Sequence, residues 1–396
     1  MTATTIDEAL LGVAPILADV RARGDDAVRE WTARFDGPRN ELRVPAAAIH
    51  EARVDDDVLE ALRRMIAAVR RFNEAQRPVD TVVEAASGIV SERRWLPLDS
   101  VGVCVPSGRA PLPSSLVMGA VPAVVAGVRR VAVITPRPVD VILVAARELG
   151  LEEVYAVGGA QGIAALAYGT ETISAVDKIV GPGSVYVTAA KLLVSGRVGI
   201  DLPAGPSEVV VIADGSASAE ECAAGLRAQA EHGPDSVALL LTDDRMLSDA
   251  VASLVVDYDN VDCELVASLD EALVRSEALA PEHLELYLSD PGPLLARVRN
   301  AGSVFVGIPA VVGDYAAGAT HVLPTGGLAR AAGGLGLEAF LKPLQIVRAN
   351  DAGLRRAREI VDPLARVEGL PNHAAALEAA VRAGARGNAD AREATA

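Results

Sequence analysis

The fold is constrained most by a regular alternation of short apolar runs with helix-like segments, which extends from about residue 101 to residue 325. The apolar runs at residues 101–105 and 131–135 have the length and the valine content of buried strands. Strands that alternate with helices in this way form parallel sheets whose faces are covered by helices. The sequence therefore predicts an α/β protein.

The alternation is interrupted once, at the loop Asp-Leu-Pro-Ala-Gly-Pro of residues 201–206, and resumes at residue 208. A new series of strand-like and helix-like segments then continues to the end of the alternating region. We therefore predict two α/β units, at residues 101–206 and 207–325. No sequence repeat between them is detectable.

The regions on either side have a different character. Residues 1–100 are mostly helical in pattern, and residues 57–73 carry apolar side chains at helical spacing, which predicts an amphipathic helix. Residues 326–396 form a C-terminal region that is rich in Ala, Arg and Glu from about residue 351. This region predicts a helical arm with little core of its own, which we expect to pack on a partner subunit.

Charge and cysteine content exclude several classes of function. A net charge of −16 argues against a nucleic-acid partner, because a phosphate backbone requires a basic face. The three cysteines form no paired framework, as expected for reduced thiols in the cytosol. Charged residues and prolines interrupt every long apolar stretch, and the N-terminus lacks the basic start of a signal peptide. We expect a cytoplasmic protein without a membrane partner.

One segment, Gln229-Ala-Glu-His232-Gly-Pro, has the character of half a metal site. Gln229 and His232 are separated by three positions, so a helix would project both side chains from one face. Gly233 and Pro234 then end the helix and leave that face open. The alternative is an ordinary polar helix terminus with a histidine near the negative end of the helix dipole.

The chain has five histidines, and all except His50 lie in segments of loop character. His283 follows Glu282 at the entry to a strand-like run, where an adjacent carboxylate and imidazole can divide acid–base work between them. The alternative is a solvated turn. His321 lies in a similar short segment, and its interpretation is open between an orienting residue and loop structure.

A zinc site can be assembled from several of these residues. Asp314 lies in a loop of small residues, where it can ligate a metal or simply form a local turn. Gln229, His232, Asp314 and His373 together give a set of nitrogen and oxygen ligands suited to a catalytic zinc ion. Their spacing is too dispersed to be diagnostic by itself.

Signals for a nucleotide cofactor are weaker. Residues 157–162 follow a strand and open a helix, so their amides can face an anion, and residues 181–184 can do likewise. Neither segment has the G-x-G-x-x-G spacing of a dinucleotide-binding turn. Residues 334–339 have that spacing, but they follow no strand, and we assign them no role.

In order and in combination, these segments resemble histidinol dehydrogenase from Trp95 to His373. The matching strings are Ala110-Pro-Leu, Val157-Gly-Gly-Ala-Gln161, Gly181-Pro-Gly183, Pro203-Ala-Gly-Pro-Ser-Glu208, Gln229-Ala-Glu-His-Gly-Pro234, Ala280-Pro-Glu-His-Leu284, Gly313-Asp-Tyr315, His321-Val-Leu-Pro-Thr325 and the pair Glu368 and His373. The resemblance implies a zinc-dependent homodimer that oxidises L-histidinol to L-histidine with two NAD through the aldehyde. It also implies a fold similar to aldehyde dehydrogenases, with two incomplete Rossmann-like units and helical N- and C-terminal extensions.

The resemblance further assigns roles to individual residues. Zinc would be held by Gln229, His232 and Asp314, with His373 contributed by the other subunit. Substrate would also contact Ser207, His283 and Glu368, the last again from the partner chain. His283 would be the base for alcohol oxidation, and Glu282 would activate water for attack on the aldehyde. The expected NAD contacts are Cys104, Gln161 and Ser184.

Two of these cofactor positions depart from the family pattern, which usually has Tyr where this chain has Cys104 and Asn where it has Ser184. The acid–base and zinc positions are all present. Two alternatives to histidinol oxidation therefore remain open. One is a related zinc- and NAD-dependent dehydrogenase of another small polar alcohol or diol, and the other is a non-catalytic zinc-binding dimer whose cofactor cleft has decayed.

Overall fold

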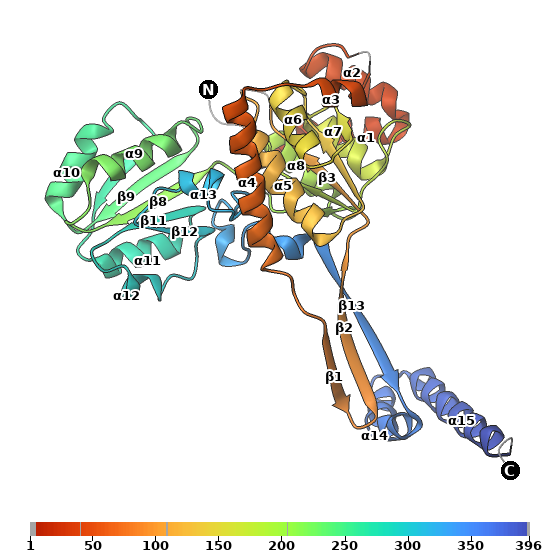
Figure 1. Cartoon of the computed structure of the whole chain (residues 1–396). Coiled ribbons are helices and arrows are strands. Elements are labelled where there is room, and N and C mark those ends of the chain that lie inside the picture. Colours follow the sequence, from red (N-terminus) through yellow and green to blue (C-terminus); the bar gives the residue numbers. More distant parts are fainter. Residues whose placement is uncertain (1–4, 40, 108–109, 204, 394–396) are drawn as a thin grey trace. The chain divides into compact units, whose positions relative to one another are not determined.

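The structure, a computed structural model, describes residues 5–39, 41–107, 110–203 and 205–393 (Figure 1). It divides into two compact units. Unit 1 contains the described residues of Met1–Arg77 and Pro97–Phe340, and unit 2 those of Pro78–Leu96 and Leu341–Ala396. No helix among the described residues has the length and apolar character needed to cross a membrane.

Unit 1 is built around two five-stranded parallel sheets. The first sheet contains β3 (Ser100–Cys104), β4 (Arg130–Ile134), β5 (Glu153–Tyr155), β6 (Lys178–Val180) and β7 (Gly199–Ile200), in the order β5-β4-β3-β6-β7. The second contains β8 (Glu208–Ala213), β9 (Val237–Thr242), β10 (Val261–Leu265), β11 (His283–Tyr287) and β12 (Ser303–Val306), in the order β10-β9-β8-β11-β12. Counted from its own first strand, each sheet has the order 3-2-1-4-5. This is the Rossmann order without its sixth strand, so the predicted pair of incomplete Rossmann-like units is confirmed.

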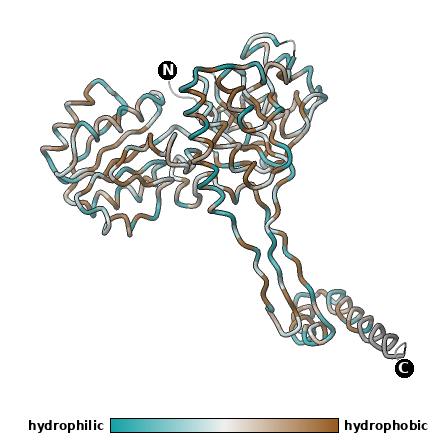
Figure 2. Tube along the Cα trace, viewed as in Figure 1, coloured by the Kyte–Doolittle hydropathy of each residue, from teal (hydrophilic) through white to brown (hydrophobic). Residues whose placement is uncertain are grey.

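Helices connect and cover the strands. In the first sheet they are α5 (Pro113–Ala126), α6 (Asp140–Glu148), α7 (Gly159–Tyr168) and α8 (Val185–Val194). In the second they are α9 (Ala219–Ala230), α10 (Arg245–Leu254), α11 (Leu269–Leu279), α12 (Gly292–Leu295) and α13 (Val311–Tyr315), and the short helices η1 (Leu328–Arg330) and η2 (Leu337–Phe340) follow. Hydrophobic residues run along the strands of both sheets (Figure 2). The central strands β3 and β8 are buried along nearly their whole length, because helices cover both faces.

The N-terminal region is helical only in part. Four helices, α1 (Ile6–Arg23), α2 (Asp25–Phe35), α3 (Ala46–Glu51) and α4 (Asp56–Glu74), confirm the prediction up to residue 74. Beyond it the prediction is wrong, because β1 (Thr81–Ala86) and β2 (Ile89–Pro97) form an antiparallel hairpin. All six residues of β1 are exposed, so the hairpin has no alternation of apolar and polar residues to reveal it.

Unit 2 joins this hairpin to the C-terminal region. The strand β13 (Leu341–Ala349) completes a three-stranded sheet of order β1-β2-β13, and α14 (Asp351–Val367) and α15 (Pro371–Glu393) follow. At the hairpin turn, Gly88 has a φ of +80°, and its carbonyl accepts a hydrogen bond from the Asn350 amide at the start of α14. The predicted C-terminal helical arm is confirmed as α14 and α15.

Within unit 1, a short connector determines which edges of the two sheets lie near each other. β7 ends at Ile200 and β8 begins at Glu208, so residues 201–207 join the carboxyl edge of the first sheet to the amino edge of the second. A chain of this length reaches about 25 Å when fully extended. The Gly326 amide also donates a hydrogen bond to Glu208 Oε1 at 2.9 Å, which ties a second segment to the start of β8.

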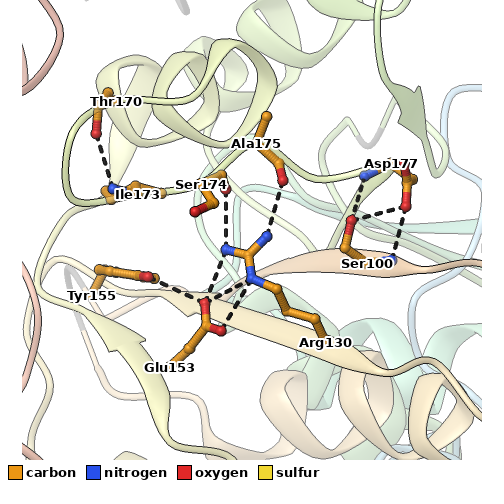
Figure 3. A network of polar contacts seen from close by, with 9 residues as sticks. All are labelled: Ser100, Arg130, Glu153, Tyr155, Thr170, Ile173, Ser174, Ala175 and Asp177. Carbon is orange, nitrogen blue, oxygen red and sulfur yellow. Dashed lines mark hydrogen bonds and ion pairs between the residues drawn. The ribbon is translucent and has the colours of Figure 1, made fainter.

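The opposite, amino edge of the first sheet is closed by a polar network (Figure 3). Arg130 pairs with Glu153, and its guanidinium also donates to the carbonyls of Ser174 and Ala175. Ser100 and Asp177 exchange further hydrogen bonds beside it. These contacts attach the loop before β6 to three strands, so this edge serves stability and the carboxyl edge is left for ligands.

Candidate active site

Six of the predicted site residues of unit 1 gather at the amino edge of the second sheet. They are Ser207, Gln229, His232, Glu282, His283 and Asp314, and electrostatic or hydrogen-bond contacts link them. Ser207 precedes β8, His283 begins β11, and Gln229 lies in the last turn of α9. In a parallel α/β sheet, the amino ends of strands and the carboxyl ends of the connecting helices share one edge. The topology therefore brings together residues that are dispersed in the sequence.

His283 is held as a neutral base. Its Nδ1 lies 3.1 Å from the carbonyl oxygen of Glu208, which can only accept a hydrogen bond, so Nδ1 carries the proton and Nε2 keeps its lone pair. Nε2 is buried and has no hydrogen-bond partner. Burial lowers the pKa of His283 to about 4. An uncharged imidazole with a free acceptor nitrogen is suited to removing a proton from a ligand.

Glu282 is the second buried titratable group beside it. Burial raises the pKa of Glu282 to about 8, while a hydrogen bond from the Glu208 amide to Oε2, at 3.0 Å, and one from the Ser207 side chain oppose the rise. Only 6% of either Glu282 or His283 is exposed. The alternative of a solvated turn is therefore wrong, and both residues have the perturbed pKa values typical of catalytic groups.

The helix that contains Gln229 ends at Ala230, so His232 lies just beyond it. His232 Nδ1 donates to the Gln229 carbonyl at 3.2 Å, which leaves Nε2 as the lone-pair nitrogen. Metal-binding histidines are commonly oriented by such a second hydrogen bond. The Gln229 side chain is buried, and its amide nitrogen has no partner. Rotation of the terminal amide by half a turn presents an oxygen at the same place.

Asp314 lies in the short helix α13, so the prediction that it occupies a loop is wrong. The predicted local turn is replaced by helical hydrogen bonds, including one from the Asp314 amide to Ala310. Burial raises the pKa of the Asp314 carboxyl, and His232 opposes the rise. His321 donates from Nδ1 to the Asp314 carbonyl at 3.3 Å. This contact attaches His321 to the helix that carries Asp314, and the choice between an orienting role and loop structure stays open.

The other two residues predicted to bind zinc or substrate belong to unit 2. Glu368 caps the end of α14, His373 lies in the first turn of α15, and both are exposed. Among the residues that the structure describes, no group of three or more His, Cys, Asp or Glu side chains is arranged to hold a metal ion. The assignment of His373 as a zinc ligand from another subunit stays a prediction.

The predicted cofactor residues Gln161 and Ser184 line one cavity of about 390 Å³ in unit 1. The other described residues that line it are Gly12, Val13, Ile16, Phe35, Asp36, Gly159, Ala160 and Tyr186. Gln161 is fully buried, yet its Oε1 has no partner. The helices α7 and α8 begin at this cavity, and neither has a side-chain cap on its first amides. The first amides of a helix can donate to phosphate oxygens, and the Gln161 oxygen can accept a hydrogen bond from a ligand.

Cys104, the third predicted cofactor contact, is not among the described residues that line this cavity. It lies at the end of β3 in the hydrophobic core with 5% exposure, and burial raises the pKa of its thiol to about 12. Sequence reasoning missed the aromatic rings of Phe35 and Tyr186 at the cavity. It also missed the role of Glu208 as the residue that orients both Glu282 and His283. The signal for Glu208 was its position inside the matching string that ends in Ser207-Glu208.

Comparison with known proteins identifies the family of this chain. A family model described as histidinol dehydrogenase matches residues 1–381. The histidinol dehydrogenase of Methanothermobacter thermautotrophicus is 44% identical over 95% of this chain and 94% of its own length. That of Synechococcus sp. is 45% identical over 91% of this chain and 90% of its own length.

Solved structures agree as well. The histidinol dehydrogenase of Elizabethkingia anophelis matches with a TM-score of 0.90 at 32% identity, over 97% of this chain and 94% of that one. Succinate-semialdehyde dehydrogenase from Burkholderia pseudomallei matches with a TM-score of 0.51 at 14% identity, over 87% and 86%, a likeness of fold alone. The predicted family resemblance and the predicted similarity to the aldehyde dehydrogenase fold are thus confirmed, and the chain belongs to the histidinol dehydrogenase family of oxidoreductases.

Proposed function

We propose that this protein oxidises L-histidinol to L-histidine with two NAD, through the aldehyde, as the last step of histidine biosynthesis. The observation that carries the proposal is His283, a neutral imidazole whose buried Nε2 has no partner, beside the buried carboxyl of Glu282. Family membership supplies the substrate class.

In the first half-reaction, His283 Nε2 would remove the hydroxyl proton of the alcohol, and the first NAD would supply the acceptor for the hydride of the adjacent carbon. The C–O bond becomes a carbonyl, and the imidazole becomes imidazolium. The carbonyl of Glu208 keeps Nδ1 protonated throughout, so Nε2 alone takes part. Ser207 in unit 1 and Glu368 from the partner subunit are proposed to hold the substrate.

In the second half-reaction, the carboxylate of Glu282 would take a proton from water, whose oxygen attacks the aldehyde carbon and gives the singly ionised hydrate. With the second NAD as hydride acceptor, this hydrate would become the carboxylic acid, which would release its proton to solvent and leave as the carboxylate. Glu282 must be ionised for this step. The Glu208 amide and the Ser207 hydroxyl donate to its carboxyl, and both contacts favour the ionised form.

The donor chemistry at this edge fits a zinc ion. Gln229, His232 and Asp314 supply an amide, an imidazole and a carboxylate, and we propose that His373 of the partner subunit completes the set. The free amide end of Gln229 and the tautomer of His232 support this assignment. When bound, zinc would orient and polarise the amino alcohol without itself changing oxidation state.

The cavity beside Gln161 and Ser184 fits part of NAD. The partnerless Gln161 Oε1 can accept a hydrogen bond from the cofactor, and the uncapped first turns of α7 and α8 can donate to its phosphates. Phe35 and Tyr186 offer aromatic faces in the same cavity. These rings supply what Cys104 does not, so the departure at that position does not argue against NAD.

A homodimer with shared sites is supported by the surface of unit 2. Its exposed apolar side chains include Val79, Val82, Val83, Val347, Ile360, Leu364 and Val367. A unit with so much apolar surface in water is expected to be covered by another chain. We propose that a second copy covers it and receives Glu368 and His373. We also propose a cytosolic location, where the three free cysteines would stay reduced.

The decisive experiment follows NADH formation with limiting L-histidinol on zinc-loaded protein, beside a chelator-treated sample and a zinc-restored sample. We expect two NADH for each histidinol, loss of turnover after chelation and recovery with zinc. One NADH for each substrate, or turnover that chelation does not affect, would contradict the proposal. Turnover of another polar alcohol but not of histidinol would support the related-dehydrogenase alternative, and absence of NAD binding would support the non-catalytic one.

A further inference from the structure

A buried ion pair lies at the carboxyl edge of the first sheet, and neither of its residues has been assigned a role above. It joins Lys191 of α8 to Asp201, which follows β7, and each side chain has only 2% of its surface exposed. Removing two charges from water is costly, and well-packed apolar side chains of similar volume are often as stable. The pair therefore calls for an explanation in terms of the groups that it holds.

Both members of the pair hold the same backbone residue, Gly181. Lys191 Nζ donates to the Gly181 carbonyl at 3.1 Å, and Asp201 Oδ2 accepts from the Gly181 amide at 2.6 Å. Gly181 has a φ of +108°, and an added Cβ would lie 2.3 Å from the carbonyl oxygen of Cys104. Only glycine fits here. Because glycine has no side chain to pack against its neighbours, its conformation depends on the hydrogen bonds of its backbone.

Gly181 opens the loop that leads into the proposed cofactor cavity. Gly181-Pro-Gly-Ser184 connects β6 to α8, and both Ser184 and Tyr186 line the cavity beside Gln161. A shift at Gly181 therefore moves the first turn of α8, which is proposed to face the cofactor. Ligand sites of open α/β sheets lie at this edge, beside the strand where the order reverses.

The same pair also reaches the connector between the two sheets. Lys191 Nζ lies 3.4 Å from the Leu202 carbonyl, and Asp201 is the first residue of that connector. The connector ends at Ser207, which contacts Glu282. One ion pair thus touches the loop of the cofactor cavity, the helix that begins there and the segment that leads to the catalytic residues.

We propose that Lys191 and Asp201 are positioning residues that fix the Gly181–Ser184 loop for NAD and hold this loop against the start of the connector, at Asp201 and Leu202. The proposal rests on the proposed function for the identity of the cofactor. Neither side chain is proposed to touch NAD or substrate. Their contribution would therefore be seen in cofactor affinity, and not in zinc binding or in the affinity for histidinol.

The test compares three variants of the zinc-loaded protein, Lys191→Met, Asp201→Asn and the double variant, with Lys342→Met as a control. Lys342 is exposed on β13 of unit 2, so it lies outside the unit that contains Gly181. NAD affinity is measured by calorimetric titration and KM values by turnover, with melting temperature and zinc content alongside.

We expect the Lys191→Met and Asp201→Asn variants to bind NAD about 10- to 100-fold more weakly, with zinc content and the KM for histidinol unchanged. Each leaves one charge unpaired, so each also melts at a lower temperature. The double variant removes both charges and should regain stability. It should not regain NAD affinity, because residue 191 no longer donates hydrogen bonds to the carbonyls of Gly181 and Leu202. Lys342→Met should bind NAD normally.

Recovery of both stability and NAD affinity in the double variant would show that the pair only fills the core, and would overturn the proposal. Normal NAD affinity in a folded single variant would do the same. If the single variants do not fold, the double variant carries the test. A wild-type protein that binds NAD without oxidising histidinol would contradict the proposed function alone, whereas one that does not bind NAD would contradict both.

Discussion

At the residue scale, three histidines of the site make the same kind of hydrogen bond. His232, His283 and His321 each donate Nδ1–H to a backbone carbonyl, so each leaves Nε2 as an acceptor. The sequence alone could point to these residue types and, through the family resemblance, to their roles. It could not predict the tautomers, because the carbonyls come from other segments or from a local turn. The neutral state of His283 depends on burial by residues distant in the chain.

Replacing His283 by alanine tests its role as the base. We expect turnover with histidinol to fall by about 10²- to 10⁴-fold, the usual contribution of a general base. Zinc content, measured by atomic absorption, should not change, because His283 Nδ1 is committed to the Glu208 carbonyl and His283 is not a proposed ligand. His50→Ala, in the exposed part of α3, is the control. Loss of metal from the His283 variant would mean that its role is ligation instead.

The pKa of Glu282 predicts a pH dependence of stability in the zinc-free protein. The folded-state pKa of about 8 lies above the ordinary value of 4.5, so unfolding releases a proton between these values and stability falls as pH rises. His283 and His321 have lowered pKa values and act with the opposite sign, but only below pH 6.5. Between pH 6.5 and 8 the Glu282 contribution should therefore amount to about 2 kcal/mol.

Urea unfolding of chelator-treated protein at both ends of this range measures that contribution. Glu282→Gln cannot ionise, so its free energy of unfolding should fall less with pH than that of the wild type. The difference between the two slopes isolates Glu282 from other groups that titrate in the same range. Equal slopes in the two proteins would show that Glu282 is already ionised at pH 6.5.

At the scale of elements, the sequence predicted the helices and strands whose burial gives a recognisable pattern of apolar residues. It missed the elements whose residues are exposed or too few to show such a pattern. The amphipathic helix α4 and the buried strands of both sheets were predictable, because each has apolar residues at the spacing of its own structure. The hairpin of β1 and β2 was missed because its residues are exposed or half-buried. The helix α13 was missed because five residues are too few to show a period.

The position of α13 depends on a buried side chain of β11. Glu285 accepts a hydrogen bond from the Ala310 amide at 2.6 Å, at the start of the helix that carries Asp314. Glu285→Leu removes this acceptor and leaves the amide unpaired. We expect zinc affinity, measured by competition with a chelator, to fall by about 10- to 100-fold, as for other residues that orient metal ligands.

Glu285→Gln is the matched variant for this prediction. Its amide oxygen can still accept from the Ala310 amide, so zinc affinity should stay close to that of the wild type. If both variants lose zinc equally, the charge of Glu285 and not the hydrogen bond to Ala310 is responsible. If neither loses zinc, α13 is held by other contacts and Glu285 has no part in the metal site.

At the scale of the whole molecule, the structure shows a duplication that the sequence conceals. Both sheets have the same strand order, yet no repeat is detectable, because a buried parallel strand requires only apolar residues and not particular ones. The connector of residues 201–207 then brings the carboxyl edge of one sheet to the amino edge of the other. The proposed function uses this connection, because its cofactor residues lie in the first α/β unit of the sequence and its acid–base residues in the second.

The division of the proposed site between two subunits can be tested with hybrid dimers. Glu282 lies in unit 1 and His373 in unit 2. If each active site takes Glu282 from one chain and His373 from the other, a dimer of one Glu282→Ala chain and one His373→Ala chain has one intact site and one site that lacks both residues. Free subunit exchange in an equal mixture should then restore about a quarter of the wild-type activity.

The control mixes Glu282→Ala with His283→Ala, because both residues belong to unit 1 and every site of the hybrid would lack one of them. Subunit exchange is verified in both mixtures with differently tagged chains. Activity that returns only in the first mixture requires that His373 act across the subunit boundary, since no chain in that mixture carries both residues. Verified exchange without recovery would place Glu282 and His373 of one site on the same chain, and the exposed apolar surface of unit 2 would then need a different explanation.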